Sequence, residues 1–77
     1  MTFDYAKLVA YFAAATRSTT YTLHGPSGHQ VLQPQEDDEI LVLNIVGQDG
    51  WELVSVTADP LPGQGFETTY WLKRAQR

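Results

Sequence analysis

The chain has 77 residues, a formal net charge of −4 and no cysteine. This length gives room for a single domain, residues 1–77, and the missing cysteine excludes disulfides, thiolate metal sites and thiol nucleophiles. Nine acidic residues against five basic ones disfavour nucleic-acid binding by phosphate neutralisation. Since no apolar run approaches the roughly 20 residues that span a bilayer and no signal-peptide pattern is visible, we expect a soluble, cytoplasmic protein without a membrane partner.

The first segment, residues 3–12, fits two kinds of secondary structure. As a strand, it alternates and places these side chains on one face: Phe3, Tyr5, Val9 and Tyr11. As a helix, it aligns these side chains along one side: Tyr5, Leu8, Val9 and Phe12. Alanines at positions 13–15 support the helix, but the aromatic residues favour the strand.

The next segment predicts a β-hairpin. Residues 19–24 (TTYTLH) are β-branched and aromatic, residues 25–28 (GPSG) have the composition of a tight turn, and residues 29–32 (HQVL) can return antiparallel. His24 and His29 then face each other across the turn. Two imidazoles can bind a metal ion or form a pH-sensitive pair, but a zinc site needs a third protein ligand. The simpler interpretation is that His24 and His29 are two polar residues beside a turn. We therefore expect no metal and no other cofactor.

A helix is predicted over residues 40–46, between an acidic segment and a glycine. The four carboxylates of residues 36–39 suit a helix N-terminus, because they cap free N–H groups and interact favourably with the helix dipole. The alternative, a cluster that binds a hard cation, lacks the EF-hand spacing. Either Gly47 or Gly50 can end the helix.

Two strands are predicted to close the chain, at residues 51–58 (WELVSVTA) and 66–74 (FETTYWLKR). Residues 59–65 are expected to form a loop, because two prolines and two glycines do not sustain a β-ladder. The order strand, hairpin, helix, strand, strand predicts the α+β class: a small antiparallel sheet with one helix packed on one face.

The second half of the chain carries a recognisable pattern. Residues 43–56 (LNIVGQDGWELVSV) and the ending 70–74 (YWLKR) resemble the small bacterial family called domain of unknown function forty-one seventy-seven. The opening Phe3-Asp4-Tyr5 is similar to the first strand of that family, and residues 19–32 look like a hairpin insertion. The resemblance implies a fold and no activity.

The apolar residues exceed what one helix and one sheet face can bury. On the helix, Val42, Leu43 and Val46 form the expected core side, whereas Leu41 and Ile45 form a second stripe. On the two closing strands, Trp51 and Leu53 are expected to point one way and Val54 and Val56 the other, with Tyr70 and Leu72 opposite Trp71. Either the N-terminal half covers the surplus, or it contacts a partner. The residues assigned to such an interface are Ile40, Leu41, Ile45, Trp51, Leu53 and Trp71.

The favoured function is therefore a non-catalytic protein-interaction or oligomerisation module, either a homo-oligomer or the partner of another protein. The alternatives are a small-molecule-binding domain on an aromatic sheet face and a small acidic inhibitor of a host protein. We expect no enzyme, because the sequence offers no nucleophile–base pair and no metal triad.

Overall fold

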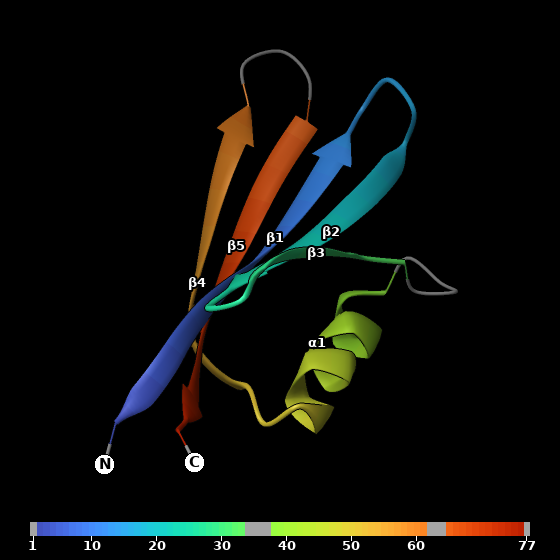
Figure 1. The fold of residues 1–77 in the computed structure, drawn as a ribbon. Helices are drawn as coiled ribbons and strands as arrows, with labels where there is room; N and C mark the ends of the chain where they lie inside the picture. Colours follow the sequence, from blue (N-terminus) through green and yellow to red (C-terminus); the bar gives the residue numbers. More distant parts are fainter. Residues whose placement is uncertain (1, 34–37, 62–64, 77) are drawn as a thin grey trace.

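The structure, a computed structural model, describes residues 2–33, 38–61 and 65–76 and contains five strands and one helix (Figure 1). The elements, in chain order, are β1 (Phe3–Ala13), β2 (Ser18–Gly25), β3 (Gly28–Leu32), α1 (Glu39–Gln48), β4 (Glu52–Leu61) and β5 (Gly65–Ala75). The predicted α+β class and the antiparallel sheet with one helix are confirmed.

The strands form one sheet in the order β3-β2-β1-β5-β4, and every neighbouring pair is antiparallel. Strands β1 and β5 lie at the centre and pair from Phe3 opposite Ala75 to Ala13 opposite Gly65. The two chain ends therefore lie side by side (Figure 1), and the Gln76 amide donates to the Thr2 carbonyl. The chain passes from one edge strand, β3, to the other, β4, through α1.

The first segment is a strand, and the helical alternative is wrong. Ala6, Leu8 and Ala10 are buried, and the residues between them are less so, which is the period of two expected of a strand with one face in the core. The alanines suit this position because β1 is a central strand and small side chains leave space above them for larger neighbours.

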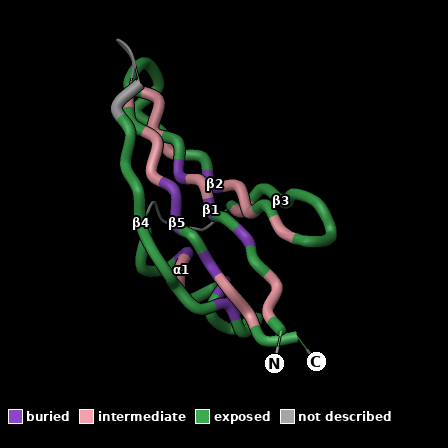
Figure 2. Tube along the Cα trace, turned by 90° about the vertical axis from the view of Figure 1, so that its left-hand side faces the viewer, coloured by how far each residue is buried: buried purple, intermediate pink, exposed green. Residues whose placement is uncertain are grey.

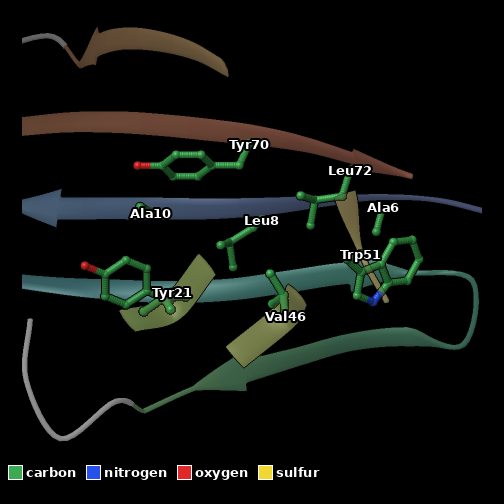
Figure 3. Packing of buried hydrophobic residues seen from close by; sticks show 9 residues of the cluster. Ala6, Leu8, Ala10, Tyr21, Val46, Trp51, Tyr70 and Leu72 are labelled. Carbon is green, nitrogen blue, oxygen red and sulfur yellow. The ribbon is translucent and has the colours of Figure 1, made fainter. Parts of the chain in front are cut away.

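One cluster of apolar side chains forms the core (Figure 3). Its members are Ala6, Leu8, Ala10, Tyr21, Val42, Val46, Trp51, Tyr70 and Leu72. Val42 and Val46 come from α1, and Leu43 packs against the same cluster while half-buried. The predicted core side of the helix is thus confirmed. Tyr70 and Leu72 are buried and Trp71 between them is exposed, as the alternation of β5 predicts.

The helix begins where the acidic residues predict it. Asp38 is the N-cap, and its carboxylate accepts a hydrogen bond of 2.9 Å from the Ile40 amide, which satisfies one of the free N–H groups of the first turn. The helix runs to Gln48 and is longer than the predicted residues 40–46. Glu36 and Asp37, also assigned to this start, lie outside the described residues. Within the described ranges, no helix is long and apolar enough to cross a membrane.

Strands β4 and β5 extend into the segment that the sequence predicts to be a loop. Asp59 pairs with Glu67, Pro60 with Phe66, and Leu61 with Gly65. A proline lacks the N–H that a central strand needs, but it is tolerated on an edge strand. Because β4 is at the edge of the sheet, Pro60 does not interrupt the ladder. Residues 62–64, in the middle of the predicted loop, lie outside the described residues.

A β-bulge makes the side chains of β4 point to other faces than the sequence predicts. Leu53 pairs with Leu72, and the register then shifts so that Ser55 pairs with Trp71 and Val56 with Tyr70. The extra residue, Val54, changes the alternation. Leu53 and Val56 therefore share the sheet face of the buried Leu72 and Tyr70, although simple alternation places them on opposite faces.

Candidate interaction surface

The sequence predicts a partner contact for Trp51, but Trp51 is part of the core. Its side chain is only 7% exposed, and its ring lies beside Ala6 in the core (Figure 3). The guanidinium carbon of Arg74 lies 4.1 Å from the ring centroid, so a cation covers the indole face. Trp51 directly precedes β4, and it lies on the core side of the sheet, as does Leu53, the partner of the buried Leu72.

The turn that precedes Trp51 explains Gly50, the second glycine of the LNIVGQDGW segment. The Gly50 amide donates to the Gly47 carbonyl, and the Trp51 amide donates to the Val46 carbonyl. Gly50 has φ of +90°, a conformation that residues with a Cβ rarely adopt. This segment ends the helix and directs Trp51 into the core, which is a structural role.

Arg74 connects this turn to the chain ends. Its Nη1 donates to the Asp49 carbonyl at 3.3 Å, and its Nη2 lies 3.9 Å from the Asp4 carboxylate. Both side chains are partly exposed, so the ion pair contributes little stability. Around it is an open hollow of about 840 Å³ with these lining residues: Asp4, Gly47, Gln48, Asp49, Gly50, Arg74, Ala75 and Gln76. None of these lining residues is aromatic.

Strand β4 is the most exposed element of the sheet. Every residue from Glu52 to Asp59 is exposed, and Figure 2 shows this strand as a continuous exposed line beside the partly buried β5. Leu53, Val54 and Val56 are 50%, 57% and 48% exposed. Isolated apolar residues are ordinary on a surface, but three on one edge strand form a patch beside free backbone N–H and C=O groups.

Charges lie at the two ends of this exposed segment. Glu52 is opposite Lys73, whereas Asp59 is opposite Glu67 on the neighbouring strand. Between Glu52 and Asp59, residues 53–58 carry no charge. Charges, proline or bulges usually protect an edge strand from pairing with another strand. In β4 the charges and Pro60 lie at the ends, and the bulge at Val54 is the only such feature along residues 53–58.

The helix has the predicted second apolar stripe. Leu41 and Ile45 are 36% and 37% exposed, and Ile40 is more exposed still. Leu41 and Ile45 each lie about 100° round the helix from a buried valine. Glu39, which bonds to Tyr70 of β5, lies on the opposite flank. The stripe therefore lies on the flank of the helix away from this bond to β5.

Trp71 lies on the sheet face opposite the buried Tyr70 and Leu72. It is 44% exposed, and its Nε1 donates to Thr57 Oγ1 at 3.3 Å. The Lys7 ammonium lies 6.0 Å from its ring centroid. These two contacts fix the ring against β1 and β4, so Trp71 is a partly covered residue of a mainly polar face.

The predicted contact between the two histidines is confirmed. His24 and His29 are direct partners across β2 and β3, and their ring centroids are 6.0 Å apart. Both side chains are exposed. Among the described residues, no group of three or more His, Cys, Asp or Glu residues is placed to hold a metal ion.

Sequence reasoning misses Val54 and Val56 as interface candidates. Simple alternation assigns Val56 to the face opposite Leu53. No pattern in the sequence predicts the bulge or the edge position of β4. Comparison with known proteins finds no family model that matches this chain and no curated protein that matches its sequence. The resemblance to domain of unknown function forty-one seventy-seven therefore stays a prediction.

Proposed function

We propose that this chain is a self-association module, in which strand β4 of one copy pairs antiparallel with strand β4 of a second copy. The observation that carries the proposal is the exposure of β4 from Glu52 to Asp59, with three apolar side chains along it. An exposed apolar edge strand offers hydrogen-bonding groups and apolar area together, which makes it a template for another strand.

A two-fold axis perpendicular to the sheet relates two such edges. This symmetry is the commonest one among protein dimers, and it joins the two five-stranded sheets into one. Leu53 and Val56 share the face of the core residues, so both copies present these side chains on the same side of the joined sheet. In this arrangement the four side chains, two from each copy, lie beside the two-fold axis on the core side of the joined sheet.

The charges of β4 limit how the two strands align. A register that sets Glu52 against Asp59 of the second copy juxtaposes two carboxylates and is disfavoured. A register that sets Leu53 against Val56 of the second copy places Glu52 opposite Thr57 instead. This second register brings apolar residues together and separates the like charges.

The mass in solution tests the proposal. Light scattering coupled to size exclusion, over a wide concentration range, is expected to give twice the 8.6 kDa mass of the chain. Val56→Lys places a charge in the centre of the interface and is expected to give the monomer mass. A monomer mass for the unaltered chain at every concentration contradicts the proposal.

The other edge of the sheet supplies a matched control. Val31 on β3 is 51% exposed, close to the 48% of Val56, so Val31→Lys makes the same chemical change at similar exposure on the opposite edge. We expect Val31→Lys to keep the dimer mass. If Val31→Lys dissociates the protein and Val56→Lys does not, the interface lies at β3 and the proposal is wrong.

A further inference from the structure

The two histidines are the complete histidine content of the chain, which also has no cysteine. Imidazole and thiolate are the side chains that bind late first-row transition metals best. All such ligands of this protein therefore lie at one place, on directly paired positions of the β2–β3 hairpin.

The geometry of the pair suits a shared ion. Two nitrogens bound to one ion lie at most about 4 Å apart, since each metal–nitrogen bond is about 2.0–2.1 Å long. Ring centroids 6.0 Å apart with planes tilted by 40° need only side-chain rotation to reach that spacing. Both rings are exposed, so an ion can enter without displacing core residues.

The hairpin holds the two backbones in place for this purpose. The turn is short, with Gly25 paired to Gly28 directly beyond the histidines, and Gly28 has φ of +117°, which glycine adopts readily. The paired backbone fixes the distance between the two Cα atoms before any ion binds. Less conformational entropy is then lost on binding.

We propose that His24 and His29 form a two-imidazole site for Cu²⁺, with water completing the coordination. Two adjacent nitrogen ligands suit the square-planar preference of Cu²⁺, whereas a zinc site asks for a third protein ligand. Cu²⁺ also has the highest affinity of the divalent first-row metals for such ligands. The net charge of −4 favours any cation near this protein.

Charged side chains from other parts of the fold lie near the pair. Lys7 is the partner of His24 on β1, and its ammonium is directed to the Trp71 ring, two strands from His24. On the other side, His29 lines a hollow of about 350 Å³ together with Asp49 and Arg74. Metal binding requires neutral imidazoles, so binding is expected to weaken as the solution is acidified.

Trp71 offers a direct readout of the bound ion. His24, Lys7 and Trp71 lie in one row across β2, β1 and β5. Strands are spaced about 4.8 Å apart, so Trp71 lies about 10 Å from His24. A paramagnetic ion at this distance is expected to quench the fluorescence of Trp71, and Trp71→Phe is expected to remove most of the quenching without changing the affinity measured by calorimetry.

The test is a titration of the full chain with CuCl₂ at pH 7.5, followed by calorimetry and by electron paramagnetic resonance. One ion is expected per chain, with two equatorial nitrogens in the resonance spectrum. His24→Gln and His29→Gln are each expected to weaken binding at least tenfold. Failure of the unaltered chain to bind, or equal binding by either single variant, overturns the proposal.

A variant of unchanged composition provides the sharpest control. Combining His29→Gln with Gln30→His moves the second imidazole by one residue, and successive strand residues point to opposite faces. Gln30 is exposed, so the exchange is expected to leave the fold intact, which a circular dichroism melt checks. Loss of binding in this variant supports the paired site. Retention of binding shows that the N-terminal amine or isolated imidazoles bind the ion, and this result overturns the proposal.

Discussion

Tyr70 donates a hydrogen bond of 2.5 Å from its hydroxyl to Oε2 of Glu39, which joins the middle of β5 to the first turn of α1. Tyr70 is a buried member of the core, whereas Glu39 lies at the surface. The contact ties the N-terminal end of the helix to β5. Leu41 and Ile45 lie on the flank of α1 opposite Glu39, away from this contact.

Removing the hydroxyl of Tyr70 tests how much this bond stabilises the fold. Tyr70→Phe keeps the ring in the core and is expected to lower the free energy of unfolding by about 1–2 kcal/mol, because a hydrogen bond to a carboxylate is lost. Glu39→Gln keeps an acceptor and is expected to cost less. Urea denaturation measures both, and equal stability of Tyr70→Phe and the unaltered chain contradicts the structural role of the bond.

The same contact predicts a loss of stability in alkali. Burial raises the pKa of Tyr70 well above its usual value of 10.0, and the hydrogen bond and the charge of Glu39 raise it further. Above pH 10 the unfolded tyrosine loses its proton while the folded one keeps it, so this group lowers the free energy of unfolding by up to about 1.4 kcal/mol per pH unit. Denaturation between pH 9 and 11 is expected to show a shallower decline for Tyr70→Phe. Parallel declines contradict this prediction.

Two glycines at the end of α1 are expected to respond in opposite directions to alanine. Gly47 lies within the helix, and a Cβ added there meets no atom of the surrounding structure within 4 Å, so Gly47→Ala is expected to stabilise by about 0.5–1 kcal/mol. Gly50 has φ of +90°, so Gly50→Ala is expected to destabilise by about 1–2 kcal/mol. Thermal melts of the two variants check the sign of each change. The same sign for both contradicts the assigned turn.

The stacking of Arg74 on Trp51 is expected to matter more than its ion pair with Asp4. Arg74→Ala uncovers one face of a buried ring and is expected to cost about 1 kcal/mol. Asp4→Asn removes the charge but keeps the Oδ1 acceptor that Gln76 uses at 2.6 Å, so it is expected to change stability by less than about 0.5 kcal/mol. Urea denaturation compares the two variants. An equal loss for both shows that the charge, rather than the ring contact, is the source of the stability.

Much of the fold could be predicted from local patterns. The turn composition of residues 25–28 is enough to place His24 opposite His29, and the aromatic residues of the first segment favour the strand that β1 forms. Asp38 caps the helix because it precedes an apolar run and its side chain can reach the Ile40 amide. Each of these features depends on residues that are close together in the sequence.

The rest depends on contacts between residues far apart in the sequence. The order of the strands makes β4 an edge, and only that position lets Pro60 stay in the ladder. The bulge at Val54 reverses the faces of the residues that follow it, and the sheet face that becomes the core is the one that Trp51 and Leu53 share. Of the interface residues that the sequence suggests, Leu53 is therefore exposed on the edge strand, whereas Trp51 lies in the core.

Self-association through β4 predicts a melting temperature that depends on concentration. Because a second copy binds the folded state and not the unfolded one, the melting temperature of the unaltered chain is expected to rise with protein concentration. Val56→Lys is expected to remove this dependence. Ile45→Lys is expected to keep it, because Ile45 lies on α1 and not on β4, on the flank opposite Glu39 and its bond to Tyr70. Calorimetric scans over a hundredfold range of concentration measure the dependence. If Ile45→Lys removes it and Val56→Lys does not, the copies meet through the helix, and the edge-strand arrangement is wrong.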